Sequence, residues 1–383
     1  MEWKEVRLGD VCNIITGFPF SGKKYSKEGI RVVRGDNVTI GNLRWDTEKD
    51  KRWNEPFDKT EYYSLQANDI VIGMDGSRVG KNKARIKEED LPLLLAQRVA
   101  CVRHNELAEQ DYLYYNIFSK KFIDYVNSIH TGSAIPHISQ KQIEDYKILL
   151  PNIETQRRIA SILSSLDRKI ELNNKINADL EEMAQAIFKN WFVDFEPFKD
   201  GKFVDSELGM IPEGWKVGCL GDLITIKYGK DHKKLDDGTF PVYGSGGFMR
   251  FVNSWLYDGE SVLIPRKGTL DNIMYVCEKF WTVDTMFFSV PKMDYVMKYV
   301  YNYIKRFDFS KMNEGTSVPS NTAARLNKMQ ILIPTHEVLE MYDETLCPIY
   351  NKRKMNDKES RTLSLLRDTL LPRLMSGEIE VPE

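Results

Sequence analysis

The sequence contains two copies of one long unit, and this internal repeat constrains the fold more than any other feature. The segment WKEVRLGDV that begins at Trp3 returns as WKVGCLGDL at Trp215, an offset of 212 residues. Later segments match at smaller offsets. They are Asn68–Ile72 with Glu260–Ile264 at 192, Gly132–Pro136 with Gly315–Pro319 at 183, and Leu149–Pro151 with Leu332–Pro334 at 183.

The change in offset separates two kinds of structure. It falls from 212 to 183 within the first part of the unit, so the second copy is shorter there by 29 residues. After Gly132 the offset stays constant. The variable part is predicted to be a mixed α/β domain with short strands, because short apolar runs are followed by glycine turns. The predicted strands are Asp69–Met74, Arg98–Val102, Ser261–Ile264 and Met286–Val290.

The constant part has the apolar spacing of a long helix in both copies. With Ile159 as position a, apolar residues dominate the a and d positions of the first helix and stay frequent in the second, which predicts a coiled-coil seam. The a positions are Ile159, Leu166, Asn173, Leu180, Ile187, then Tyr342, Ile349, Asn356, Leu363 and Leu370. The d positions are Ile162, Lys169, Ile176, Met183, Asn190, then Thr345, Lys352, Glu359, Leu366 and Arg373.

Both helices place an asparagine at the third a position, Asn173 and Asn356. A polar residue in a seam lowers stability but penalises wrong registers, since only one alignment satisfies its hydrogen bonds. The alternative is that both asparagines lie on a solvated face. Their matched positions favour a role in setting the coiled-coil register.

A helix from Glu154 to Trp191 would be about 55 Å long, too long to bury its apolar stripe within one ordinary domain. Antiparallel packing against its counterpart would bury the stripe, place two domains at opposite ends of a rod and create an approximate twofold axis. Such symmetry suits two DNA half-sites in inverted orientation. The predicted fold is mixed α+β, with two globular domains separated by two long helices. The expected segments are 1–150 and 199–333 for the domains, and 151–198 and 334–383 for the helices with their exit segments.

Composition limits the class of protein without assigning a function. A hydrophobic content of 42% over 383 residues supports packed cores and argues against disorder. No apolar stretch approaches a membrane span, and the charged start MEWKEVRLGD is unlike a signal peptide. Five scattered cysteines without a CxxC pair indicate reduced thiols and a cytoplasmic protein. The net charge of −2 neither favours nor excludes a nucleic-acid partner.

Motifs of catalysis are missing from the sequence. There is no Pro-Pro pair, which the catalytic tetrapeptide of a DNA methyltransferase would need, and no Pro-Asp dipeptide of the common nuclease motif. No GxxxxGK[ST] loop is present for ATP, and no cluster of histidine, cysteine and carboxylate residues has metal-ligand spacing. The chain is therefore predicted not to be an enzyme and to bind no metal.

Four segments resemble a known family. TGSAIPHIS (131–139), the run from ILLPNIETQRR to IELNNKI (148–176) and NWFVDFEPF (190–198) resemble the specificity subunits of Type I restriction-modification systems. LPRLMSGEI (371–379) is similar to their C-terminal end. The resemblance covers essentially the whole chain. It departs at His336-Glu337-Val338, where the family usually has a glutamine-containing helix start.

The resemblance implies a non-catalytic subunit whose two target-recognition domains each read one half of a bipartite, asymmetric DNA site. The helices would set the spacing of the half-sites and dock methyltransferase subunits. The implied partners are double-stranded DNA, two methyltransferase subunits and two restriction subunits. S-adenosylmethionine, ATP and Mg²⁺ are then expected on those partners, with no cofactor on this chain.

Candidate DNA-binding residues follow from chemistry, because arginine, asparagine and glutamine can pair with base edges while lysine mainly contacts phosphates. In the first copy they are Arg34, Asn37, Arg78, Lys81, Lys83, Arg85, Gln97 and Arg98. In the second copy they are Lys230, Lys233, Lys234, Arg266, Lys267, Asn272, Ser317, Asn321 and Arg325. For any single residue, a solvated surface side chain is the alternative.

Two further alternatives stay open from the sequence. The aromatic residues Trp191, Phe192, Phe195 and Phe198 would either dock a methyltransferase subunit or pack beneath the second domain. The main rival function is an orphan or phase-variable interaction subunit that kept the duplicated architecture and lost DNA reading.

Overall fold

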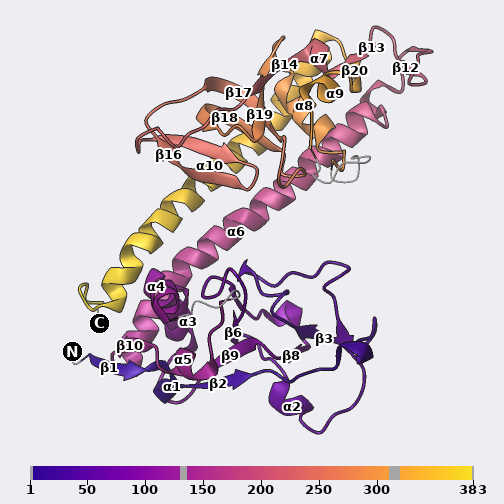
Figure 1. The fold of residues 1–383 in the computed structure, drawn as a ribbon. Coiled ribbons are helices and arrows are strands. Elements are labelled where there is room, and N and C mark those ends of the chain that lie inside the picture. Colours follow the sequence, from indigo (N-terminus) through magenta and orange to yellow (C-terminus); the bar gives the residue numbers. More distant parts are fainter. Residues whose placement is uncertain (1–2, 130–135, 310–319, 382–383) are drawn as a thin grey trace. The chain divides into compact units, whose positions relative to one another are not determined.

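The structure is a computed structural model that describes residues 3–129, 136–309 and 320–381 (Figure 1). The chain divides into two compact units. The first unit comprises Met1–Leu172 with Glu359–Glu383, and the second comprises Asn173–Lys358.

Both boundaries between the units fall inside long helices. These helices are α6 (Ile153–Phe192) and α10 (His336–Met375), each of 40 residues. The predicted helix from Glu154 to Trp191 is thereby confirmed. The sequence prediction treated each helix as a segment of its own, whereas the packing groups one half of each helix with each globular domain.

The first unit holds a five-stranded sheet in the order β2-β9-β6-β7-β4 and a three-stranded sheet in the order β5-β3-β8, while β1 pairs antiparallel with β10. The strands are β1 Lys4–Arg7, β2 Cys12–Thr16, β3 Ile30–Val33, β4 Ile40–Gly41, β5 Arg52–Trp53, β6 Ile70–Gly73, β7 Lys83–Arg85, β8 Leu93–Leu95, β9 Val99–His104 and β10 Lys147–Leu150. The helices are α1 Leu8–Val11, η1 Gly22–Lys24, α2 Thr60–Tyr63, η2 Glu88–Asp90, α3 Gln110–Phe118, α4 Lys120–Ile129 and α5 Gln140–Glu144.

The second unit holds a six-stranded sheet in the order β14-β19-β17-β18-β15-β16, with separate antiparallel pairs β13-β20 and β11-β12. Its strands are β11 Phe203–Val204, β12 Ile211–Pro212, β13 Lys216–Cys219, β14 Ile224–Tyr228, β15 Phe240–Gly244, β16 Gly247–Val252, β17 Tyr257–Pro265, β18 Met274–Thr282, β19 Met286–Pro291 and β20 Gln330–Ile333. Its shorter helices are η3 Glu196–Phe198, α7 Leu220–Leu223, α8 Met297–Ile304 and α9 Ala323–Asn327.

The four predicted strands are confirmed as β6, β9, β17 and β19. The apolar run in β6 is buried on both faces, with Ile70, Val71 and Ile72 all at 0% exposure. Because side chains alternate along a strand, Ile70 and Ile72 enter one core and Val71 enters another. In β17 the residues from Val262 to Ile264 divide between two cores in the same way. Each domain is therefore built on a central strand between two hydrophobic layers.

Matched hydrogen bonds show that the sequence repeat is a structural repeat. The hydroxyl of Tyr112 on α3 donates to the Leu149 carbonyl at 2.6 Å, and that of Tyr299 on α8 donates to the Leu332 carbonyl at 2.6 Å. Each tyrosine ties the helix after the central sheet to the strand that leads into a long helix. The bond is made by corresponding residues in the two copies.

A pair of matched glycines lies close against a neighbouring backbone segment, one in each domain. A Cβ atom on Gly17 would lie 2.2 Å from the Ala96 carbonyl oxygen, and one on Gly229 would lie 2.0 Å from that of Val283. No side chain fits at these distances, which explains why both copies keep glycine where β2 and β14 end.

The two long helices run antiparallel to each other within each unit. In the second unit Asn177 of α6 bonds to Asn356 and Asp357 of α10, at 2.8 and 2.7 Å. One turn later along α6, Glu181 pairs with Arg353, which lies earlier along α10. In the first unit Asp167 of α6 pairs with Arg367 of α10 at 2.7 Å.

The seam between the helices follows the predicted a positions but not the predicted d positions. Asn173 and Asn356 are 1% and 2% exposed. At a predicted d position, Met183 is 53% exposed, while its neighbour Ala184 is fully buried. In α10 the predicted d residue Leu366 is likewise 44% exposed, while Leu346 and Leu374, each one residue after a predicted d position, are buried. The d prediction was therefore wrong by one residue in both helices. In α10 the buried row includes Arg353 and Arg367, which a hydrophobic pattern does not mark.

The aromatic residues at the end of α6 pack within the second unit. Rings of Phe192, Phe195 and Phe198 surround Trp215, with centroids 5.1 to 5.6 Å away. Phe192 is only 5% exposed. Of the two alternatives for this segment, the structure shows packing beneath the second domain.

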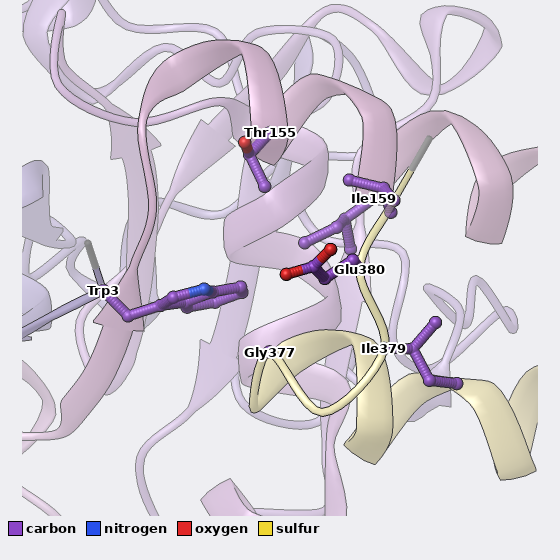
Figure 2. A pocket seen from close by; sticks show the side chains of 7 residues that line it. Trp3, Thr155, Ile159, Gly377, Ile379 and Glu380 are labelled. Atoms are coloured by element: carbon purple, nitrogen blue, oxygen red, sulfur yellow. The ribbon is translucent and has the colours of Figure 1, made fainter. Parts of the chain in front are cut away.

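The matching corner of the first unit borders a cavity. Trp3, the counterpart of Trp215, lines a cavity of about 130 Å³ (Figure 2). Val381, at the position of Phe198, also lines it. The other lining residues are Thr155, Ile159, Gly377, Ile379 and Glu380. A Cβ atom on Gly377 would lie 2.7 Å from the Trp3 ring, so the glycine of the LPRLMSGEI segment lets the C-terminal segment turn against Trp3.

Within the described part of the chain, no helix combines the length and apolar character needed to cross a membrane.

We predict that Tyr112→Phe and Tyr299→Phe each lower the free energy of unfolding by about 1–3 kcal/mol, because each change leaves a carbonyl without its hydrogen bond. Urea unfolding followed by tyrosine and tryptophan fluorescence measures the effect. Tyr62→Phe is the control, since Tyr62 is 58% exposed and its hydroxyl makes no such bond. Equal stability of all three variants would contradict the structural role of the matched bond.

Candidate nucleic-acid interface

Three loops of the first unit meet at one edge of its larger sheet. In the antiparallel register Thr16 at the end of β2 lies opposite Ala100, and Gly73 at the end of β6 lies opposite Val99. The loops that follow β2 and β6 therefore lie beside the turn that precedes β9. In the second unit, Tyr228 at the end of β14 and Pro265 at the end of β17 meet the start of β19 in the same way. We call these matched loops the edge loops.

The edge loops of the first unit expose four of the predicted DNA-binding residues. Arg78 and Lys81 lie in the loop after β6, while Gln97 and Arg98 form the turn before β9, and all four side chains are exposed. Arg98 has a φ angle of +66°, which few residues with a side chain adopt. The structure thus brings these four predicted residues together on one edge.

Arg98 belongs to a charged cluster that sequence reasoning missed. Its Nη1 atom lies 2.5 Å from Oδ2 of Asp75, and the other carboxylate oxygen of Asp75 bonds to Nδ1 of His137. Burial alone would raise the pKa of Asp75, but the hydrogen bonds from Arg98 and His137 outweigh it, so the pKa lies below its ordinary value. The signal available in the sequence was Asp75 within the GMDGS loop, beside the predicted Arg78.

Arg34 and Asn37 occupy a separate loop after β3. The Asn37 side chain is fully buried and donates to the carbonyls of Arg44 and Lys49, each at 3.0 Å, while its oxygen accepts from the Arg34 amide. With its hydrogen bonds committed inside the protein, Asn37 is withdrawn from the predicted DNA contacts. The Arg34 guanidinium is partly exposed and lies over the Tyr25 ring at 5.7 Å.

Lys83 and Arg85 on β7 point into the protein. Lys83 is 3% exposed, donates to the Gly80 carbonyl at 2.9 Å and lies over the ring of Phe122 at 5.0 Å. Burial lowers the pKa of Lys83 to about 7. Arg85 pairs with Asp111, lies over the Tyr114 ring at 4.6 Å and has a pKa lowered by burial. Both are withdrawn as DNA contacts, because a strand of alternating period places residues 83 and 85 on one face, here the buried one.

The loop after β14 exposes Lys230, Lys233 and Lys234 in the second unit. Arg250 of β16 holds this loop, donating to the His232 and Leu235 carbonyls at 2.8 Å each and pairing with Asp237 at 3.0 Å. Arg250 therefore holds the backbone of the loop that carries the three lysines. Arg250 was not predicted, and its sequence position on an outer strand gave no sign of this role.

The loop after β17 contains Arg266, Lys267 and Asn272. Arg266 is partly buried, donates to the Asp284 carbonyl at 2.8 Å and lies over the Tyr228 ring at 4.9 Å. Asn272 donates to the Ser245 carbonyl at 2.9 Å. Lys267 is exposed between them. These bonds stiffen the loop, and Lys267 is its most accessible cation.

The remaining predictions lie near the start of α9. Asn321 is 3% exposed and donates from Nδ2 to the Pro265 carbonyl at 2.9 Å, so it clamps the loop and is withdrawn as a DNA contact. Arg325 is partly buried, and its backbone amide donates to the capping hydroxyl of Thr322 at 3.3 Å. Ser317 lies outside the described residues.

Metal chemistry has no visible basis in the described part of the chain, where no group of three or more histidine, cysteine or carboxylate side chains could hold an ion. The five cysteines are free thiols. The edge loops present exposed lysine, arginine and glutamine side chains at the ends of paired strands.

Comparisons with known proteins agree with the duplicated architecture. The family model described as the Type I restriction modification DNA specificity domain matches residues 1–182 and again residues 212–344. The Type I restriction enzyme MjaIX specificity subunit of Methanocaldococcus jannaschii is 28% identical over 71% of this chain and 70% of that protein. The HindI specificity subunit of Haemophilus influenzae is 22% identical over 99% of this chain and 100% of that protein.

A crystal structure has a similar fold. The S subunit of a Type I restriction-modification system from M. genitalium superposes with a TM-score of 0.58 at 18% identity, covering 98% of this chain and 96% of that one.

We predict that the stability difference between wild type and Lys83→Met depends on pH. Above the folded pKa of about 7 and below the ordinary 10.5, the unfolded chain binds a proton at Lys83 that the folded chain lacks. Wild-type stability should therefore gain up to about 1.4 kcal/mol per pH unit across this window relative to the variant. Urea unfolding at several pH values between 7 and 10 measures this slope.

Lys81→Met is the matched control, because Lys81 lies in the same segment with its side chain exposed. Its stability should follow the wild-type pH profile. If Lys83→Met also follows that profile, the amine is not buried in solution.

Proposed function

Because this chain belongs to the Type I restriction-modification DNA specificity family, we propose that its two units each read one half of a bipartite, asymmetric DNA target. The chain is a DNA sequence-recognition subunit and not the catalyst of its system. Sequence selection by such a subunit requires side chains that reach base edges and phosphates from a rigid frame.

The edge loops are the observation that carries this proposal. In each unit they present exposed side chains of the types that contact DNA, Arg78 and Gln97 in the first and Lys230 and Lys267 in the second. The loops start from corresponding strands, yet their residues differ. Two equivalent surfaces with different chemistry suit a target whose halves have different sequences.

The contact set proposed after the structural corrections is smaller than the sequence prediction. It comprises Arg34, Arg78, Lys81, Gln97, Arg98, Lys230, Lys233, Lys234, Arg266, Lys267, Asn272 and Arg325. Arginine and glutamine are the proposed base readers, and the lysines are proposed to contact phosphates.

The long helices are proposed to set the spacing between the half-sites and to dock methyltransferase subunits. We assign the register of the pair to Asn173 and Asn356, which are almost fully buried. Asn356 donates to Asn177 across the seam at 2.8 Å, a bond that a shifted alignment would lose.

The partners proposed for the chain are double-stranded DNA, two methyltransferase subunits and, for cleavage, two restriction subunits. S-adenosylmethionine, ATP and Mg²⁺ are then bound by those subunits. The proposed location is the cytoplasm, where the DNA of the producing cell is reached directly.

Methylation mapping tests the function as a whole. The chain is co-expressed with its methyltransferase subunits in a host that lacks other DNA methylation, and methylated bases are located by single-molecule sequencing. We expect methylation at one asymmetric sequence with two specific halves and an unspecified spacer. Methylation without a sequence preference, or none with an assembled complex, would favour the interaction subunit that has lost DNA reading.

We predict that Arg78→Ala and Lys267→Ala act on different halves of the target. Each variant should weaken binding of the assembled complex to DNA, and point changes in only one half-site should lose their effect with Arg78→Ala. Lys267→Ala should lower the salt dependence of binding by about 0.9 in the logarithmic slope, the loss of one phosphate contact. Fluorescence anisotropy at several salt concentrations measures both effects.

Lys4→Ala and Lys216→Ala are the matched controls, because these lysines are exposed on β1 and β13, at corresponding positions away from the edge loops. They should leave affinity and salt slope unchanged. Equal loss of reading at both half-sites by Arg78→Ala would contradict modular recognition.

A further inference from the structure

Asp75, Arg98 and His137 form a charged cluster at the edge loops of the first unit. Asp75 follows β6, Arg98 precedes β9, and His137 precedes α5, so three separate segments meet at one carboxylate. Asp75 and His137 also form a β-bridge through their backbones. The cluster is therefore fixed by main-chain as well as side-chain bonds.

The side chains of the cluster differ in their exposure to solvent. The Asp75 side chain is 22% exposed, whereas that of Arg98 is 66% exposed. A carboxylate facing the phosphates of DNA would repel them. Here the carboxylate lies beneath two nitrogen donors, and the guanidinium is the group presented to solvent.

The backbone beneath Arg98 is also constrained. Its φ angle of +66° is strained for a residue with a Cβ atom, and strain of this kind persists where the surrounding structure enforces it, often at functional sites. The Arg98 carbonyl accepts from the Met74 amide at 3.0 Å. One hydrogen bond thus fixes the base of this side chain and another, to Asp75, fixes its tip.

The atoms left over on Arg98 define what it can bind. Nη1 is bonded to Asp75, while Nε and Nη2 form no hydrogen bond with any described residue. These two atoms form one planar edge with parallel donors. Guanine presents two acceptors, O6 and N7, side by side in the major groove, and a paired arginine contact is the match for them.

We propose that Asp75 is a positioning residue that holds Arg98 for a paired contact to one guanine in the first half-site. The inference rests on the proposed function and adds the base and the residues that read it. Fixing the guanidinium before binding removes much of the conformational entropy that a free arginine would lose on the DNA. His137 holds the second oxygen of Asp75 and keeps the carboxylate turned toward Arg98.

The matching positions among the described residues of the second unit do not form this cluster. Lys267 stands at the position of Asp75, Thr285 at that of Arg98 and Ser320 at that of His137. The guanine contact therefore belongs to the first half-site alone.

The test uses the full chain assembled with its methyltransferase subunits on its mapped target. Competition binding is measured with all four base pairs at each position of the first half-site. Wild type should prefer guanine at one position by about fivefold to 150-fold, the range for one paired contact. Arg98→Ala should abolish this preference, and Arg98→Lys should keep most of the overall affinity but still lose the preference.

Asp75→Asn separates positioning from structure, because it keeps the shape and removes the charge. It should reduce the same guanine preference several-fold, leave preferences in the second half-site unchanged and leave the melting temperature close to that of wild type. His137→Gln should have a smaller effect at the same position. Lys4→Ala, at an exposed position on β1 away from the edge loops, is the control that should leave the guanine preference unchanged.

Three results would overturn the inference. Equal loss of affinity for all four base pairs with Arg98→Ala would make Arg98 a phosphate contact. An unchanged guanine preference with Asp75→Asn would show that Asp75 does not position Arg98, and the same change in both half-sites would indicate a general structural role. A wild-type complex without any sequence preference would instead contradict the proposed function itself, so the two failures are distinguishable.

Discussion

The structure depends on burying the apolar stripe of two 40-residue helices, which neither helix can do alone. In each unit a tyrosine, a carboxylate and an arginine fasten the globular domain to both helices. Tyr115 donates to Asp167 at 2.7 Å in the first unit, and Arg367 pairs with the same carboxylate. In the second unit Tyr301 donates to Glu181 at 2.9 Å, and Arg353 pairs with it.

The two sets of bonds use the same residue types on the same helices. Both carboxylates stand on α6 and both arginines on α10, so the pairing favours α6 against α10 over two copies of either helix. Removing one partner of such a pair lowers stability, because the remaining charge is left partly buried without a partner. Within each unit, these bonds hold the globular domain against both helices.

The sequence predicted the architecture well because the repeat and the helical spacing are properties of many residues at once. It predicted the a positions of the seam correctly, since apolar residues mark them. It missed the d positions of α10 because the true seam there contains Arg353 and Arg367, which are held by ion pairs between the helices. A pattern of hydrophobic residues cannot identify such pairs.

The candidate interface was predictable only in part, for a related reason. The residue types alone could not tell Arg78, which is exposed, from Lys83, which points inward five residues later. Asn37 and Asn321 have the side chain of a base reader, but Asn37 bonds to a carbonyl of its own loop and Asn321 to the Pro265 carbonyl at the end of β17. Asp75 was missed because a carboxylate is not expected on a DNA-binding surface until its neighbours are known.

The bonds that frame the edge loops are made by the main chain. The amide of Gly17 donates to the Val99 carbonyl, and that of Gly229 donates to the Met286 carbonyl. The amides of Ile138 and Asn321 donate to the carbonyls of Met74 and Arg266 in the same matched fashion. Because these bonds join main-chain atoms, mutations at the exposed residues between the anchors can change the surface of the loops without removing the bonds. Target specificity can therefore evolve faster than the scaffold that displays it.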